Sequence, residues 1–390
     1  MQLLVRHAIL VIVAPILLML SACVQGRAQP ASPIDLTGEW PMEGYGPARS
    51  RTIETEIAPP LSGQHEYLLT DAAAQASPVT IAGGLLFVEG KNKLFAVALD
   101  SGKEQWQFSL KGAYFSPAVV DGTVFVRSEN GDEGYVLALS AATGARLWQY
   151  QFPTVGSSYD NIGGHVTSPV VVGGRLLVGA AHSFVALDAA TGNEQWVFPT
   201  EFPVVSSASI DDDTVYFSDF TRLYAVDLQT GQERWRFDHG KLSLYFAPVL
   251  FADQVALSGH DTIYVLNRAD GSLAWSRGFA DLQMIPAGAS ARYLFVKSPT
   301  QLWALDLRDG RVVWNYAVTN FVSLPAISGD HLFVVTRAQG GSQVRALQER
   351  DGQEIWRNDQ LEITNAAPVI AGGRVYVRLL DGRVMAFAPS

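Results

Sequence analysis

A repeated pattern that ends in tryptophan constrains the fold of this chain more than any other feature. Its clearest copy, residues 186–196, reads Ala-Leu-Asp-Ala-Ala-Thr-Gly-Asn-Glu-Gln-Trp. The Gly-x-x-x-Trp ending occurs seven times, and successive glycines are separated by 42, 48, 39, 40, 39 and 42 residues. The seven tryptophans are Trp106, Trp148, Trp196, Trp235, Trp275, Trp314 and Trp356. A period of this length indicates a propeller, a solenoid or another array in which each unit buries one face on its neighbours.

Each repeat is predicted to form four antiparallel strands. In the third copy, apolar residues alternate through 167–172, 175–179, 182–188 and 194–198, and glycine-containing turns separate these runs. An apolar period of two with a glycine every 8–12 residues is typical of strands and excludes a helix. The unit is therefore a four-stranded meander.

The number of strands predicts a closed ring. Eight units can be traced, but only seven have the tryptophan ending, and the last unit stops after three strands. The units begin at Ser77, Ser116, Thr167, Ser206, Phe246, Ile285, Leu324 and Ala366. An isolated strand at 64–69 can supply the missing fourth strand, which would remove exposed sheet edges. We therefore expect an all-β, eight-bladed β-propeller over residues 64–390 that exists as a monomeric ring.

The N-terminus is predicted to be a lipoprotein signal. A short positive region and an apolar run precede Leu20-Ser21-Ala22-Cys23, and this box resembles the one cut before the cysteine in bacterial lipoproteins. Residues 1–22 are then the signal peptide, Cys23 the lipidated residue, 23–35 a flexible tether and 36–63 a lead-in segment. The alternative is an ordinary secretory signal with an incidental cysteine. Either signal predicts an extracytoplasmic protein. In a two-membrane bacterium, the resemblance to known lipoprotein sorting implies that Val24 directs the protein to the outer membrane, facing the periplasm. In a bacterium with one membrane, the protein is expected on the outer face of the cytoplasmic membrane.

Composition and spacing exclude several classes of function. The formal net charge of −10 argues against binding to nucleic acid, which needs basic patches. The histidines are scattered about one per unit, without metal-ligand spacing. We expect no metal site, no catalytic residues and no enzymatic activity.

The repeat Ala-x-Asp-x-x-Thr-Gly-x-x-x-Trp resembles the tryptophan motif of quinoprotein-type propellers, the pyrroloquinoline-quinone-like (PQQ-like) repeat family, over roughly residues 64–390. The resemblance implies that the seven tryptophans pack between blades. It also raises a quinone cofactor as an alternative, but the cysteine pair that such enzymes carry is absent because Cys23 is the only cysteine. We therefore expect no cofactor. Trp40 and Tyr45, in the lead-in segment, are predicted to pack along the ring.

Departures from the repeat predict where recognition occurs. Segments 128–134, 153–166 and 337–343 enlarge connections that emerge on one face of the ring. Loops on a rigid scaffold commonly carry binding residues. The candidate interaction rim comprises Glu129, Asn130, Asp132, Glu133, Tyr159, Asp160, Asn161 and His165. A calcium or cationic-peptide site is one hypothesis for this rim, and tolerated surface variation is the alternative.

Two classes of function remain. The signal, the length and eight blades without a cofactor resemble the BamB-type lipoproteins of outer-membrane protein assembly, which implies a non-catalytic scaffold that binds protein partners in the cell envelope and is attached to the membrane through Cys23. In that family a stretch between blades three and four that carries leucines and an arginine binds a partner, whereas residues 199–205 here contain no arginine. The alternatives are a quinoprotein-dehydrogenase-related protein and a generic extracytoplasmic ligand-binding propeller.

Overall fold

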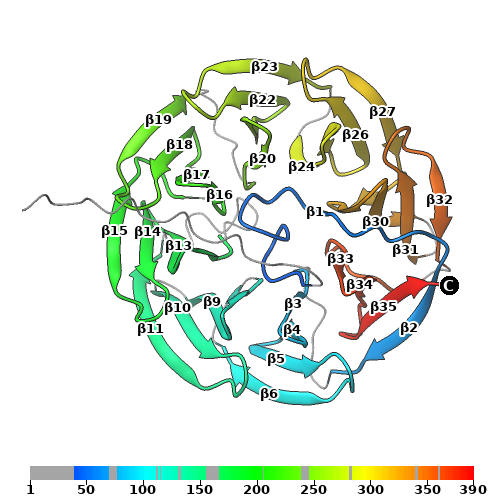
Figure 1. The fold of residues 1–390 in the computed structure, drawn as a ribbon, viewed down its shortest axis with the longest axis horizontal. Helices are drawn as coiled ribbons and strands as arrows, with labels where there is room; N and C mark the ends of the chain where they lie inside the picture. Colours follow the sequence, from blue (N-terminus) through cyan, green and yellow to red (C-terminus); the bar gives the residue numbers. More distant parts are fainter. Residues whose placement is uncertain are drawn as a thin grey trace, which may run out of the picture.

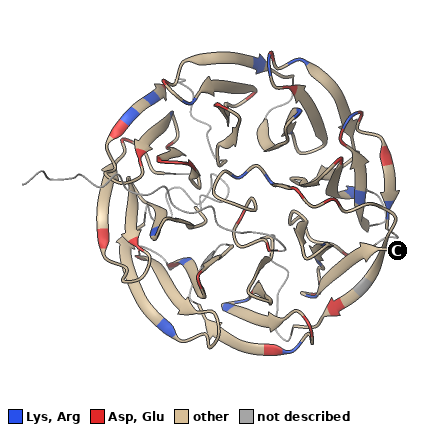
Figure 2. Ribbon diagram, viewed as in Figure 1, with Lys and Arg blue, Asp and Glu red and all other residues tan. Residues whose placement is uncertain are grey.

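The computed structural model describes residues 39–69, 77–110, 113–114, 116–130, 133–154, 167–204, 206–238, 246–280, 283–338, 341–358 and 361–390. Within these ranges the chain forms strands and no helix, so no described helix could cross a membrane. Eight sheets, each built on four antiparallel strands, stand around a central axis (Figure 1). Both basic and acidic residues lie on the outer strands around the ring (Figure 2). The prediction of an all-β, eight-bladed propeller is confirmed.

The first four blades follow one another along the chain, and each is given from its innermost to its outermost strand. Blade 1 contains β3 (Thr80–Ala82), β4 (Leu85–Gly90), β5 (Lys93–Ala98) and β6 (Glu104–Ser109). Blade 2 contains β8 (Ala118–Val120), β9 (Thr123–Asn130), β10 (Glu133–Ser140) and β11 (Arg146–Pro153), with β7 (Ala113–Tyr114) paired to β9. Blade 3 contains β12 (Val170–Val172), β13 (Arg175–Ala180), β14 (Ser183–Asp188) and β15 (Glu194–Pro199). Blade 4 contains β16 (Ser209–Asp211), β17 (Thr214–Ser218), β18 (Arg222–Asp227) and β19 (Glu233–Asp238).

The remaining four blades complete the ring. Blade 5 contains β20 (Val249–Phe251), β21 (Gln254–Ser258), β22 (Thr262–Asn267) and β23 (Leu273–Gly278). Blade 6 contains β24 (Ile285–Ala289), β25 (Tyr293–Lys297), β26 (Gln301–Asp306) and β27 (Val312–Ala317). Blade 7 contains β29 (Ala326–Ser328), β30 (His331–Ala338), β31 (Gly341–Gln348) and β32 (Glu354–Arg357), with β1 (Thr52–Ile53) and β28 (Phe321–Val322) added. Blade 8 contains β33 (Val369–Ala371), β34 (Arg374–Arg378), β35 (Val384–Pro389) and β2 (Leu61–Tyr67).

The N-terminal strand closes the ring as the strand count predicts. β2 pairs antiparallel with the C-terminal strand β35 and is the outermost strand of blade 8. It begins at Leu61, three residues before the predicted start at Gln64, because a register shift between Gly63 and His65 lets the pairing continue. The first and last strands of the ring are thereby held in one sheet, and no blade is left with three strands.

The repeat tryptophans lie between neighbouring blades. The indole Nε1 of Trp148 donates a 3.0 Å hydrogen bond to the carbonyl of Ala189 in the next blade. Its ring covers Gly192, where an added Cβ would lie 2.6 Å from Trp148 Cε3. The same pair of contacts joins Trp196 to Leu228 and Gly231, and equivalent pairs follow Trp106, Trp235, Trp275 and Trp314. Six of the seven repeat glycines therefore meet two needs: a positive φ in the turn, and space for the indole of the preceding blade. The seventh, Gly102, also has a positive φ, but an added Cβ there would lie 3.3 Å from Nε2 of His65.

Residues 39–57 of the lead-in segment cross one end of the ring and contact the innermost strands of most blades (Figure 1). Trp40 is buried, forms two backbone hydrogen bonds with Ile81, and its ring lies 5.3 Å from that of Tyr45. Further along, β1 adds a parallel strand to β29. The segment therefore covers one end of the central axis with its own backbone.

Candidate interaction site on the rim of the ring

The two ends of the ring are built differently. Residues 39–57 lie beside the turns that join first and second strands, since their partners Ile81 and Ile327 directly precede such turns. The links between blades and the turns between second and third strands emerge at the opposite end, which we call the rim. In blade 3, for example, the link residues Thr200 and Val204 donate backbone hydrogen bonds to the carbonyls of His182 and Ala181. The rim is therefore a surface of connections fastened to a rigid ring.

Two hairpins extend the rim, as the departures from the repeat predict. Strands β9 and β10 have eight residues each, and so do β30 and β31, whereas β13 and β14 have six. The extra residues continue the ladder: Glu129 pairs with Gly134, and Asn130 pairs with Glu133. In segments 128–134 and 337–343, the described residues thus extend β9, β10, β30 and β31 by two residues beyond β13 and β14.

The described residues of the predicted rim are engaged with their own hairpin. Glu129 forms an ion pair with Arg127, a buried side chain whose pKa is lowered chiefly by burial and held up in part by Glu129. Glu133 accepts hydrogen bonds from the hydroxyl of Tyr135 and, at 3.3 Å, from Nε2 of Gln151. These carboxylates are therefore partnered within the hairpin.

The other residues of the predicted rim lie outside the described residues. They are Asp132, Tyr159, Asp160, Asn161 and His165, and Cys23 lies outside as well. Their grouping with Glu129 and Glu133 stays a prediction.

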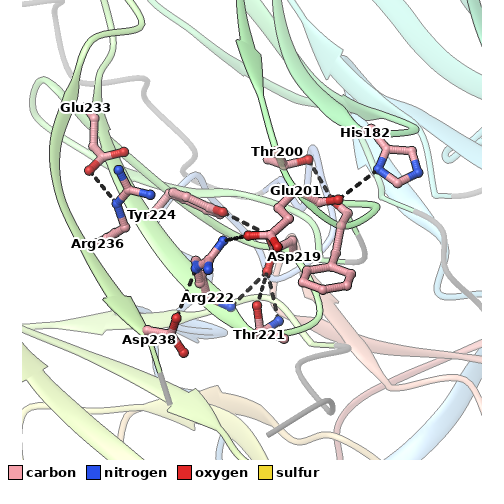
Figure 3. A network of polar contacts seen from close by, with 11 residues as sticks. His182, Thr200, Glu201, Asp219, Thr221, Arg222, Tyr224, Glu233, Arg236 and Asp238 are labelled. Carbon is pink, nitrogen blue, oxygen red and sulfur yellow. Dashed lines mark hydrogen bonds and ion pairs between the residues drawn. The ribbon is translucent and has the colours of Figure 1, made fainter. Parts of the chain in front are cut away.

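A polar network at the junction of blades 3 and 4 was not predicted as a site (Figure 3). Its centre is Asp219, a fully buried carboxylate in the turn between β17 and β18. Its Oδ1 accepts backbone hydrogen bonds of 2.8 Å from both Thr221 and Arg222, and its Oδ2 accepts one of 2.8 Å from the hydroxyl of Tyr224. Burial, and then this bond, raise the pKa of Tyr224 to about 12, so the phenol remains a donor at physiological pH. The turn is consequently rigid.

Arg222 connects this turn to the link between blades 3 and 4 (Figure 3). Its guanidinium forms ion pairs with Glu201 in the link and, at 3.0 Å, with Asp238 at the end of β19. These carboxylates raise the pKa of Arg222 above its ordinary value. The carbonyl of Glu201 also lies 3.2 Å from Nδ1 of His182. Two adjacent blades therefore fix the position of the link.

The sequence carries one signal for this site. An aspartate followed by Phe-Thr-Arg between two strands is a common turn former, because its carboxylate can accept backbone N–H groups two and three residues later. The contact from Arg222 to Glu201 joins residues of different blades. To predict this contact, one would need the relative positions of the two blades, and the spacing of the repeats does not give them.

The described residues offer little for metal chemistry. Among them no group of three or more His, Cys, Asp or Glu side chains could hold a metal ion. His182 lies beside a backbone carbonyl, and the ring of His65 lies 4.6 Å from that of Tyr67.

Comparison with known proteins identifies the family. Residues 60–160, 158–238 and 259–390 match the family described as "Outer membrane protein assembly factor BamB". The chain belongs to the BamB family. It is 25% identical over 283 residues to the outer membrane protein assembly factor BamB of Burkholderia pseudomallei, covering 67% of this chain and 70% of that one.

Solved structures agree on the fold. BamB from Moraxella catarrhalis superimposes with a TM-score of 0.64 at 16% identity, covering 84% of this chain and 99% of that one. Quinohemoprotein alcohol dehydrogenase from Comamonas testosteroni superimposes with a TM-score of 0.69 at 14% identity, covering 90% and 80%. At these identities the likeness shows the propeller fold alone, which the BamB family shares with quinoproteins.

An arginine side chain from blade 4 lies against the link between blades 3 and 4, whose own sequence contains no arginine. Residues 199–205 contain no arginine, but Arg222 reaches Glu201 from the neighbouring turn. The described part of this BamB-family link therefore presents an arginine, an exposed glutamate and the half-buried ring of Phe202 in one place.

One feature that the resemblance to quinone-dependent dehydrogenases implies is missing from this sequence. The vicinal cysteine pair implied by that resemblance has no counterpart, because the sequence contains one cysteine, at position 23. One end of the ring is also covered by residues 39–57, which bond to the innermost strands.

Proposed function

We propose that this protein is a non-catalytic scaffold of the cell envelope that takes part in outer-membrane protein assembly by binding protein partners. The observation that carries the proposal is the match to the BamB family across 60–160, 158–238 and 259–390, which covers the ring except for residues 239–258. A closed propeller is a rigid support, and rigid supports with functional connections are a common design for recognition. The protein acts as one monomeric ring.

The rim at blades 3 and 4 is the proposed contact surface. Glu201 is 59% exposed and Arg222 22% exposed, so both have atoms available to a partner while holding each other in position. Phe202 directly follows Glu201 and is half-buried. Aromatic and arginine side chains that are already held in place are the residues that most often dominate binding energy, because little conformational freedom is lost on association.

Attachment to the membrane follows from the signal sequence. In this proposal Leu20-Ser21-Ala22-Cys23 is processed, Cys23 carries the lipid, and the ring lies at the outer membrane on its periplasmic side. Replacement of Cys23 by serine should release the protein from membranes into the soluble envelope fraction. Retention in the membrane fraction would contradict the anchor without affecting the contact surface.

The test of the contact surface is co-purification of assembly components with Arg222→Ala and a matched control. Removing Arg222 frees Glu201 and the link, and we expect recovery of outer-membrane assembly components to fall about tenfold, a loss typical of a central contact. The control is Arg236→Ala in the same blade, which removes an exposed 2.9 Å pair with Glu233 and should change recovery little. Equal recovery with both variants would overturn the assignment of this surface.

A further inference from the structure

A groove opens at the end of the ring that faces away from the rim. Its volume is about 1320 Å³, and it lies over blades 1, 2 and 3. The turns between first and second strands form its walls at Gly83, Asp121–Thr123 and Gly173–Gly174. Turns between third and fourth strands, Ala141–Ala142 and Asp188–Ala190, form its outer side. No residue of the described rim lines it.

The lead-in segment shows how an extended chain binds this end of the ring. Innermost-strand amides of six blades donate to its carbonyls: Ile81 to Trp40, Val119 to Pro41, Ile210 to Pro47, Leu250 to Ala48, Ala289 to Ser50 and Ile327 to Arg51. These bonds have lengths of 2.8–3.3 Å. The corresponding residues of the other two blades are Val171 in blade 3 and Ile370 in blade 8. Among the described residues no such carbonyl reaches either amide.

The two unmatched positions differ in their surroundings. Ile370 is fully buried within the hydrophobic cluster that contains Trp40 and Ile57 from the lead-in segment. Val171 is also buried, in the hydrophobic cluster that contains Met42 from the lead-in segment, but of the two positions only Val171 lines the groove. Between Pro41 and Pro47 the lead-in segment passes from blade 2 to blade 4 and forms no described backbone hydrogen bond with the innermost strand of blade 3. The groove is lined in part by this strand.

The groove has an acidic lining. Glu39, Asp121 and Asp188 line it, and no lysine, arginine or histidine does. Asp121 is exposed and has no hydrogen-bond or ion-pair partner among the described residues. Glu39 accepts a 2.8 Å bond from the amide of Gly83, and Asp188 is held by the Thr191 turn with Arg175 nearby. The field in the groove therefore comes mainly from Asp121 and Glu39.

We propose that this groove binds an extended, positively charged polypeptide segment of a partner protein. The volume exceeds the range of about 300–1,000 Å³ that holds most small ligands. A strand-like segment would offer a carbonyl at Val171, as the lead-in segment does in six blades, and its lysine or arginine side chains would meet Asp121 and Glu39. This site is separate from the rim, so the protein would hold two partners, or two parts of one, at opposite ends of the ring.

The test is a titration of the full-length protein, in detergent, with a labelled nonapeptide of alternating lysine and threonine, followed by fluorescence anisotropy. We expect binding to the unaltered protein and about tenfold weaker binding to the Asp121→Asn/Glu39→Gln double variant, since this variant lacks both carboxylates that would pair with the lysine side chains. The peptide with glutamine in place of lysine should bind as weakly as the double variant does.

The matched control is Asp212→Asn. Asp212 occupies the equivalent turn of blade 4, has the same φ of 49° as Asp121, and does not line the groove. It should bind the lysine peptide as the unaltered protein does. A second variant, Ala142→Trp, fills the groove from an exposed position and should abolish binding without changing the thermal midpoint.

Three results would overturn the proposal. They are equal affinity for the lysine and glutamine peptides, an equal loss with Asp212→Asn, and unchanged binding to Ala142→Trp. Light scattering gives a further check, because a dimer that Ala142→Trp dissociates would make a second copy of this chain the occupant instead.

Discussion

The substitution Gly192→Ala tests the packing that joins the blades. An added Cβ at Gly192 would lie 2.6 Å from Trp148 Cε3, closer than packed atoms can approach, and the residue has a φ of +74°. Gly174, in the same blade, is the matched control. Its φ is +73°, but no atom lies within 4 Å of an added Cβ. The two substitutions share the backbone penalty, and only one displaces a tryptophan.

The expected magnitudes follow from these two contributions. A left-handed conformation costs a Cβ-bearing residue about 1–2 kcal/mol, which should be the whole effect of Gly174→Ala. Overpacking adds about 1–3 kcal/mol, so Gly192→Ala should lower the free energy of unfolding by about 2–5 kcal/mol in total. Urea denaturation followed by tryptophan fluorescence measures both, provided that the m-value is unchanged.

A double-mutant cycle sharpens the result. In a Trp148→Ala background the indole is gone, so the cost of Gly192→Ala should fall to that of Gly174→Ala. Equal costs for the two glycine substitutions in the natural background would refute the view that Gly192 makes room for the tryptophan of the preceding blade.

Three further predictions concern buried charges and the cofactor. Burial raises the pKa of Glu89 to about 7. The native state then holds a proton that the unfolded state loses, so stability should fall by up to about 3 kcal/mol as pH rises from about 4.5 to 7, and Glu89→Gln should remove this dependence in urea titrations at pH 5 and 8. Burial lowers the pKa of Lys297 to about 8, and its ammonium lies 5.5 Å from the Phe321 ring centroid. Lys297→Met should therefore raise the melting temperature at pH 7. The gain should be smaller at pH 10, because the unaltered protein becomes more stable as the amine of Lys297 deprotonates. An equal gain at both pH values would contradict the view that the buried charge of Lys297 destabilises the protein. Incubation with pyrroloquinoline quinone and calcium, followed by desalting, should leave no stoichiometric absorbance, and a retained chromophore would contradict a non-catalytic scaffold.

The sequence predicted the fold well because its signals are local and repeated. Glycine turns and alternating apolar residues recur in each unit, and seven of the eight units have the tryptophan ending. Because the last unit has only three strands, the sequence also predicted that an N-terminal strand, which is β2, completes blade 8. The start of β2 was placed three residues late. A register shift at His65 depends on pairing with β35, a strand more than 300 residues away, and no local pattern reports it.

The interaction site was predicted only in part. The long hairpin β9–β10 follows from the extra residues around Glu129, which disturb the period. The network around Asp219 and Arg222 lies in a repeat of ordinary length, so spacing gave no reason to single it out. The lead-in segment shows the same limit: its aromatic content predicted packing, but its bonds to six blades depend on the arrangement of the whole ring.

The central claim is that the rim at blades 3 and 4 contacts the machinery of outer-membrane protein assembly. The most direct measurement places a photo-crosslinking amino acid at Phe202 on this rim and, in a separate protein, at Val197 on the outer strand of the same blade, which is 44% exposed. After irradiation of intact cells, the account predicts a crosslinked adduct with an outer-membrane protein assembly component from position 202 and none from position 197. Adducts of equal yield from both positions, or no assembly component from position 202, would contradict it.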